Sequence, residues 1–264
     1  KEAALEERVP VLTPEKPRGT AFMDAVGVFA PEISVVVAYG HILLPEVLAL
    51  PSRGSVNLHA SRLPELRGAA PIAWSLIRGY RMTGITVMRM TEGMDEGPIL
   101  LQRDVPIGEE DTAGGLASRL SEVGAEALIE VLALLEFGSI EPVEQDSARA
   151  TYAPKLDRES ARIDWAREAH EVANHVRGND PSPGAWTTFL GEPVKLFSPR
   201  VAEADAASDT GASPGTVVSA RSTLRVGAGR GAVDFGGAQP SGKRRMEASD
   251  WLRGGGPKEG DLLV

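Results

Sequence analysis

The stretch Ile33–Gly40, with the sequence ISVVVAYG, is a run of β-branched and small residues that ends in glycine. Such a run predicts a strand buried on both faces, which is typical of a parallel sheet. The stretch Gly54–His59, GSVNLH, predicts a second strand with polar residues at its C-terminal end. Helices are expected over residues 43–50 and 68–78, and further strands over residues 84–90 and 100–105. This alternation indicates an α/β domain with a mostly parallel sheet.

A long helix is expected after Thr112, because apolar residues recur at helical spacing until Gly138 ends the pattern. Residues 1–140 are therefore predicted to form the first domain. Hydrophobic periodicity is lost over residues 141–158, which we interpret as a linker.

Residues 159–264 are predicted to form a second, smaller domain of a different type. A helix is expected over Trp165–Val176, and residues 202–215 are rich in Pro, Ala, Ser and Asp, as in a loop. Short strands with turn residues between them are expected at 186–189, 194–197, 216–219, 224–226 and 232–235. This pattern predicts a small antiparallel, OB-like barrel.

Composition excludes several classes of protein. The 264 residues contain no cysteine, which excludes disulfides, cysteine-ligated metal sites and a thiol nucleophile. No run of 18 apolar residues is present, so a membrane-spanning helix is not expected. The formal net charge of −9 argues against indiscriminate nucleic-acid binding, although Lys243, Arg244 and Arg245 form a local basic cluster.

Three polar residues are expected to meet at the ends of neighbouring strands. Asn57 and His59 are two residues apart, so they project from the same face of one strand. Asp95 lies in a turn after the next predicted strand. Each residue alone has an ordinary structural explanation, but an amide, an imidazole and a carboxylate at one sheet edge favour a site.

This trio suits acyl transfer between two bound substrates. A Ser–His–Asp hydrolase would need Ser61 as its nucleophile, but no G-x-S-x-G motif surrounds that serine. The Asn57 amide and a protonated His59 would instead hold an oxyanion, and Asp95 would orient the imidazole or take a proton.

Other candidate motifs carry less weight. His41 either lines a pocket or caps a turn, and both interpretations remain open. His170 and His175 are five residues apart, so they do not share a helical face as metal ligands would. The glycines at 227, 229 and 231 favour a hairpin turn over a dinucleotide-binding loop, because no helix follows them.

The string NLHASRLPELRGAAPIAWSLIRG, residues 57–79, resembles the N-x-H core of the 10-formyltetrahydrofolate-dependent formyltransferases, and MDEGPIL, residues 94–100, resembles their Asp loop. Within that superfamily the chain is most similar to the methionyl-tRNA formyltransferases. The resemblance covers nearly the whole chain through VVVAYGHILL, EDTAGGL, TYAPKLDRESARIDW, GEPVKLF and QPSGKRRM. It implies a Rossmann-like formyltransferase fold followed by a C-terminal barrel.

The resemblance also implies a reaction and roles for residues. The formyl group of 10-formyltetrahydrofolate would pass to the α-amine of initiator methionyl-tRNA, in the cytoplasm, with the folate as cosubstrate and no metal. The protein would act as a monomer without a membrane partner. The implied catalytic residues are Asn57, His59 and Asp95. The implied folate-contacting residues are Ser61, Arg62, Leu63, Pro64, Ala38, Tyr39 and Gly40, and those implied for tRNA are Lys243, Arg244 and Arg245.

Two departures from the family pattern stand out. Arg62 occupies a position where the family usually has leucine. The family also has an opening βαβ unit with a G-T-P motif, which we expect to precede Lys1, so that a targeting segment could precede it as well. Without this unit we expect the chain to be poorly folded or inactive alone.

Two rival functions remain at this stage. One is a formyltransferase that acts on an amino-sugar nucleotide, which would share the trio but is disfavoured by the ARIDW stretch, residues 161–165, and by the barrel. The other is a tRNA- or folate-binding module without catalysis. The acceptor used would separate the first rival, and the effect of replacing His59 would separate the second.

Overall fold

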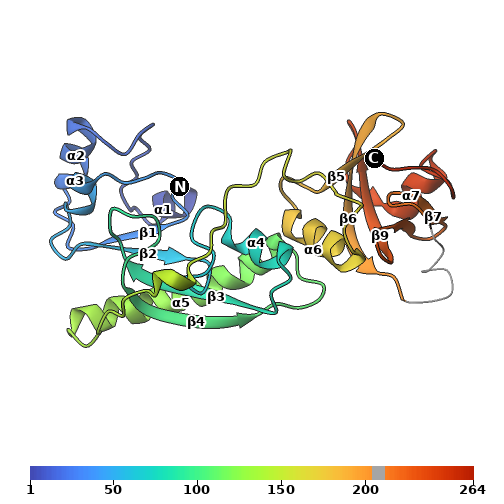
Figure 1. The fold of residues 1–264 in the computed structure, drawn as a ribbon. Helices are drawn as coiled ribbons and strands as arrows, with labels where there is room; N and C mark the ends of the chain where they lie inside the picture. Colours follow the sequence, from blue (N-terminus) through green and yellow to red (C-terminus); the bar gives the residue numbers. More distant parts are fainter. Residues whose placement is uncertain (204–211) are drawn as a thin grey trace.

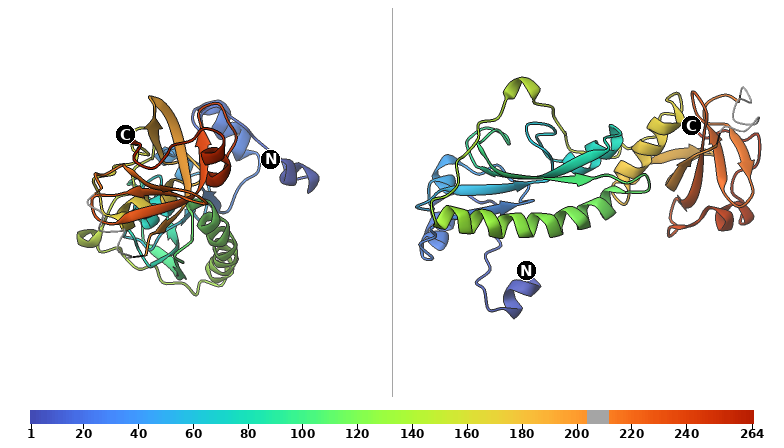
Figure 2. Two further views of the ribbon diagram at one scale, coloured as in Figure 1. Left: turned by 90° about the vertical axis from the view of Figure 1, so that its right-hand side faces the viewer. Right: turned by 90° about the horizontal axis from the view of Figure 1, so that it is seen from below.

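The computed structural model describes residues 1–203 and 212–264, which form two domains at opposite ends of an elongated molecule (Figures 1 and 2). The first domain contains α1 (Glu2–Glu6), α2 (Thr20–Gly27), β1 (Ser34–Val37), α3 (Pro45–Leu48), β2 (Ser55–His59), α4 (Pro71–Ile77), β3 (Met82–Arg89), β4 (Ile99–Pro106) and α5 (Ala113–Glu136). The short helix η1 (Ser147–Arg149) and the helix α6 (Ala169–Asn179) follow. The second domain contains β5 (Trp186–Phe189), β6 (Glu192–Val201), β7 (Val217–Ala220), β8 (Leu224–Gly227), β9 (Ala232–Pro240), β10 (Met246–Glu247) and α7 (Ala248–Arg253).

The sheet of the first domain is mixed, so the prediction of a mostly parallel sheet was wrong. Its strands lie in the order β1-β2-β3-β4, and in the described part of the chain only β1 and β2 pair in parallel. The connection through α4 returns the chain antiparallel to β2. β-Branched runs report burial and say nothing of strand direction, which is why the sequence pattern misled.

Strand β1 is covered on one face only. Val35 and Val37 are 40% and 49% exposed, while the residues between and before them are more buried. The prediction that this strand is buried on both faces was therefore wrong. Its parallel pairing with β2 aligns Val37 with Leu58, so the residues after β1 continue beside the end of β2.

Helix α5 covers one face of the sheet, as the apolar periodicity predicted (Figure 2). The Thr112 hydroxyl caps its first turn by accepting a hydrogen bond from the Gly115 amide at 3.2 Å. Leu116, Leu120 and Val131 of α5 are buried in one hydrophobic core with residues of β2, β3, β4 and α4. This core fixes β2 against α5, which leaves the opposite face of β2 for the polar residues.

The second domain is a curled antiparallel sheet around its own core. Its strands follow the order β5-β6-β9-β8-β7, and β10 pairs with β9. The C-terminal residues 261–264 hydrogen-bond to Thr188 on β5 and to Gly215 and Val217 near β7, so they bridge the two edges of the curl. The prediction of an antiparallel barrel is thus confirmed in the coarser sense of a half-barrel. The loop expected at residues 202–215 falls largely outside the described residues.

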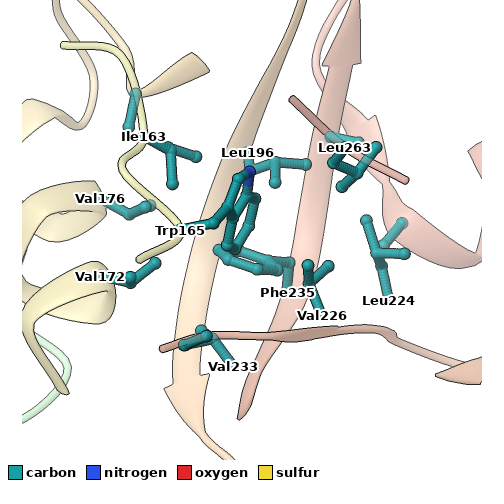
Figure 3. Close-up of a cluster of buried hydrophobic side chains, with 14 of the residues drawn as sticks. Ile163, Trp165, Val172, Val176, Leu196, Leu224, Val226, Val233, Phe235 and Leu263 are labelled. Carbon is teal, nitrogen blue, oxygen red and sulfur yellow. The ribbon is translucent and has the colours of Figure 1, made fainter. Parts of the chain in front are cut away.

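Helix α6 belongs to the core of the second domain. Val172 and Val176 point from α6 toward Trp165, whose ring meets Phe235 edge-on at 5.8 Å between centroids (Figure 3). The helix begins at a capping box formed by Glu168 and Glu171, later than the sequence pattern suggested. Its other face packs on α4 of the first domain, so α6 joins the two domains.

Hydrogen bonds and close packing hold α6 to the first domain. Arg177 donates hydrogen bonds to the carbonyls of Gly108 and Asp111, at 2.9 and 3.3 Å. Arg119 donates two hydrogen bonds to the Asp111 carboxylate, which holds the pKa of that carboxyl below its usual value despite the opposing effect of burial. Burial lowers the pKa of the Arg177 guanidinium.

Replacing Gly178 tests this packing. A β-carbon there would lie 2.7 Å from the Ala73 carbonyl oxygen and 2.5 Å from Ile77 Cγ1, so the two helices would have to separate. We expect Gly178→Ala to lower the free energy of unfolding by about 1–3 kcal/mol, although alanine normally stabilises a helix. Gly115→Ala, at an exposed position of α5, is the control and should raise the free energy of unfolding by up to about 1 kcal/mol. Equal effects in urea unfolding would contradict the close approach.

The Asp111 pair predicts a pH-dependent contribution to stability. Because the pKa of Asp111 is lower in the folded protein than in the unfolded chain, where it is about 3.9, the carboxylate stabilises the fold above that pH. We expect Asp111→Asn to lower the free energy of unfolding by about 1–3 kcal/mol at pH 7. The difference from the parent should shrink as the pH falls below about 4. Glu126→Gln, an exposed site on α5, is the control, and a difference that persists unchanged at pH 3 would refute the pairing.

Candidate active site

Strand β2 presents Asn57 and His59 on the face that α5 does not cover. The intervening Leu58 points the other way and lies against Gly124 of α5. The His59 side chain is only 7% exposed, whereas Asn57 is half-buried. The alternation predicted from the sequence therefore places an amide and an imidazole side by side.

Asp95 reaches this pair from the loop between β3 and β4. Its carboxylate Oδ2 lies 3.6 Å from His59 Nδ1 and accepts a hydrogen bond from the Gly68 amide at 2.9 Å. The Asn57 Nδ2 atom lies 3.5 Å from Asp95 Oδ1, at the limit of a hydrogen bond. The structure thus brings together all three residues of the predicted trio.

The route by which Asp95 arrives differs from the one expected. Strand β3 runs antiparallel to β2, so its C-terminal end pairs with Val56 at the start of β2 and not with His59. The loop 90–98 has to turn back over the exposed face of β2, and Asp95 adopts a left-handed backbone conformation with φ of 53°. The reasoning from parallel strand ends was wrong, although it named the residues that meet.

The second nitrogen of His59 is held by the backbone. Its Nε2 atom lies 2.9 Å from the Leu66 carbonyl oxygen, which can only accept a hydrogen bond. Nε2 therefore carries the ring hydrogen, and Nδ1 is the ring nitrogen that faces Asp95. A backbone carbonyl and a carboxylate together fix the orientation of the imidazole.

A segment from the linker runs along this site. We call residues 143–154 the strap. Val143 pairs with Ile99 through two backbone hydrogen bonds of 2.8 Å. The Ala153 amide donates to the Arg67 carbonyl at 2.7 Å, and the Ala153 carbonyl accepts from the Ala70 amide at 3.1 Å. The closeness of this contact explains Gly68, whose φ is 116° and whose β-carbon, if present, would lie 2.8 Å from the Ala153 carbonyl oxygen. Gly68 thus lacks a side chain at the point where the strap passes.

The strap also supplies residues that sequence reasoning missed. The Gln145 side chain donates hydrogen bonds to the carbonyls of Asp95 and Gly97, and it accepts from the buried guanidinium of Arg67. Glu96 Oε2 lies 3.9 Å from the same guanidinium. Arg67 and Glu96 lie inside stretches that resemble the family, whereas Gln145 lies in the predicted linker, where no sequence signal marked it.

The predicted folate loop turns most of its side chains inward. The Ser61 hydroxyl is buried and donates to the Glu65 carbonyl at 2.6 Å, and Leu63 and Pro64 are buried. Arg62 is half-exposed and pairs with Asp104 at 2.7 Å. Any ligand beside this loop would therefore meet its backbone or the Arg62 side chain.

The residues Ala38, Tyr39 and Gly40 lie at the exposed end of β1. The pairing of Val37 with Leu58 brings them to the same end of the sheet as His59. The rings of Tyr39 and His41 lie 5.5 Å apart between centroids and tilt toward each other. This edge offers exposed aromatic surface next to the trio, which is consistent with a pocket wall.

The basic cluster of the second domain is not uniform. Lys243 and Arg244 are exposed in the turn between β9 and β10. Arg245 instead makes two hydrogen bonds to the buried carboxylate of Asp180, at 2.9 and 3.2 Å, and its guanidinium lies over the Phe197 ring. Arg245 thus ties the end of α6 to the half-barrel.

Neither a cluster of metal ligands nor a membrane-spanning helix is found in residues 1–203 and 212–264. In those ranges no three His, Asp or Glu side chains gather as ligands for a metal ion. His170 is exposed beside Glu168, whereas burial lowers the pKa of His175. No helix in the described part is both long and apolar enough to cross a membrane.

Comparison with known proteins identifies the family. A domain family described as formyl transferase matches residues 2–132, and the formyl transferase C-terminal domain matches residues 155–256. The structure of HypX from Aquifex aeolicus in complex with tetrahydrofolic acid superposes with a TM-score of 0.69 at 21% identity, over 92% of this chain and 44% of that one. This likeness shows a shared fold.

Sequence relatives are closer. The methionyl-tRNA formyltransferase of Thermodesulfovibrio yellowstonii is 41% identical over 98% of this chain and 82% of its own length. That of Bacillus subtilis is 42% identical over 100% of this chain and 82% of its own length. With both domains present in order and this identity throughout, the chain belongs to the methionyl-tRNA formyltransferase family.

Proposed function

We propose that this protein transfers the formyl group of 10-formyltetrahydrofolate to the α-amino group of methionyl-tRNA, with Asn57, His59 and Asp95 as its catalytic residues. The observation that carries the proposal is the convergence of the three side chains, with Asp95 within 3.6 Å of both His59 and Asn57. Because the acceptor is a substrate of translation, the proposed site of action is the cytoplasm.

The trio supplies what formyl transfer to an amine requires. As the amine nitrogen bonds to the formyl carbon, the carbonyl electrons move onto oxygen, and this oxyanion needs hydrogen-bond donors. The Asn57 amide donates one hydrogen bond. His59 donates another from Nδ1 when both of its ring nitrogens carry hydrogen, since Nε2 is committed to Leu66.

Asp95 handles the proton in this proposal. The attacking amine gains positive charge as its bond to carbon forms, and the Asp95 carboxylate accepts the surplus proton. When the oxyanion returns its electrons, the bond from the formyl carbon to the folate nitrogen breaks, and that nitrogen takes up the proton that Asp95 accepted from the amine. The Gly68 amide at 2.9 Å holds the carboxylate in place throughout.

The fit of the folate rests on the surfaces beside the trio. The exposed Ala38–Gly40 edge with its Tyr39 ring suits a planar heteroaromatic ring system. The loop Ser61–Pro64 would meet the folate through its backbone and Arg62, because its other side chains are buried. Neither step of the transfer calls for a metal ion in this proposal.

The second domain is proposed to hold the tRNA, with Lys243 and Arg244 as exposed phosphate contacts. Arg245, whose side chain is 45% exposed, would support them from its ion pair with Asp180. Binding by these two residues alone would be salt-dependent, as expected for phosphate contacts.

Replacing His59 tests the proposed reaction directly. With 10-formyltetrahydrofolate and charged initiator methionyl-tRNA, we expect His59→Ala to form N-formylmethionyl-tRNA about 10²–10⁴-fold more slowly than the parent. His170→Ala, an exposed histidine of α6, should match the parent. Mass spectrometry of the aminoacyl product measures the transfer.

The same assay separates the rival functions. Formyl transfer to an amino-sugar nucleotide in preference to methionyl-tRNA would favour a sugar formyltransferase. Folate and tRNA binding with no product, in the parent as in His59→Ala, would reject the proposed catalysis in this chain.

A further inference from the structure

Within the described strap, Gln145 is the residue whose side chain hydrogen-bonds to the β3–β4 loop that carries Asp95. Its Nε2 atom donates to the carbonyl oxygen of Asp95 at 2.9 Å and to that of Gly97 at 2.8 Å. Both amide hydrogens are therefore used on the same loop. A single side chain 50 residues away in sequence holds the backbone on which the catalytic carboxylate is mounted.

The oxygen end of Gln145 is held just as firmly. Its Oε1 atom accepts from Arg67 Nε at 3.2 Å and from Arg67 Nη2 at 2.8 Å. Arg67 is only 3% exposed, so its guanidinium cannot exchange this partner for bulk water at little cost. Two carbonyl acceptors at one end and a guanidinium donor at the other allow only one orientation of the amide.

The loop needs such support. Asp95 has a φ of 53°, a left-handed conformation that is uncommon for residues other than glycine. Its carboxylate also has to lie within reach of His59, and misplacement by about 1 Å can cost ~10²-fold in rate. The two hydrogen bonds from Gln145 fix the backbone at the carbonyl of Asp95 itself and at that of Gly97, two residues later.

We infer that Gln145 is a positioning residue, which holds Asp95 against His59 from the linker between the two domains. This inference rests on the proposed function, because Asp95 is its catalytic carboxylate. Arg67 acts through Gln145 by orienting the amide. The linker is on this view a component of the active centre as well as a connection.

Two replacements separate donation from acceptance. Gln145→Met removes both functions at similar size. Gln145→Glu keeps an acceptor for Arg67 but has no hydrogen to donate to the carbonyls of Asp95 and Gly97. We expect both variants to lower kcat by about 10–10²-fold while KM for folate and for methionyl-tRNA changes by less than about 3-fold. Ser147→Ala, exposed and two residues away, is the matched control and should behave as the parent.

A second measurement, of the Gly68 amide by NMR, does not depend on activity. The Gly68 amide donates to Asp95 Oδ2, so its proton resonance in an NMR spectrum reports where the carboxylate lies. In Gln145→Met and Gln145→Glu we expect this resonance to shift toward its position in Asp95→Ala, with the fold retained. In Ser147→Ala it should not move.

The outcomes are distinct. A Gly68 resonance that stays at the parent position in both Gln145 variants would overturn the positioning role, as would a kcat within about 2-fold of the parent. If the parent produces no N-formylmethionyl-tRNA, the proposed function fails, and the Gly68 resonance alone decides the role of Gln145. If Gln145→Met does not fold, Gln145→Glu still decides it, because its carboxylate preserves the bond to Arg67.

Discussion

The site depends on the contact between the Asp95 carboxylate and the His59 imidazole, although the strand before Asp95 runs antiparallel to the strand that holds His59. Strand β3 ends beside Val56, at the far end of β2 from His59, so Asp95 is delivered only because the loop 90–98 folds back over β2. The fold supports this loop from three sides, through the Asn57 amide, the Gly68 amide and the Gln145 side chain. Two of these contacts, from Gly68 and from Gln145, place further requirements on the fold.

Those requirements extend well beyond the sheet. Gly68 has to lack a side chain because the strap passes against it, and the strap has to cross the site because Gln145 is on it. The strap then leads to α6, which belongs to the core of the second domain and packs on α4. The candidate site and the junction between the domains are thus connected through the strap and α6.

Much of this could be predicted from sequence where the signal is local. The existence of a strand within Ile33–Gly40, the stripe of α5 and the strands of the half-barrel depend on residues close together in the chain. Asn57 and His59 could be paired because a strand alternates its faces, whatever its direction. Strand direction itself could not be predicted, because an α4-sized connection fits a parallel or an antiparallel return.

The remaining errors concern long-range partners. No local pattern links Gln145 to Arg67, 78 residues earlier, or Arg245 to Asp180, 65 residues earlier. A KRR string at 243–245 looks the same whether its arginine faces RNA or an internal carboxylate. The family resemblance covers Arg67 and Arg245 but neither Gln145 nor Asp180, and only the three-dimensional arrangement shows these pairs.

The central claim is that Asp95 and His59 act as one unit, and a double-mutant cycle measures this most directly. Asp95→Asn, His59→Asn and the double variant would be compared by kcat/KM for formyl transfer to methionyl-tRNA. A unit predicts strong non-additivity, with the double variant about as slow as the slower single variant. Losses that multiply, as for independent residues, would contradict the claim.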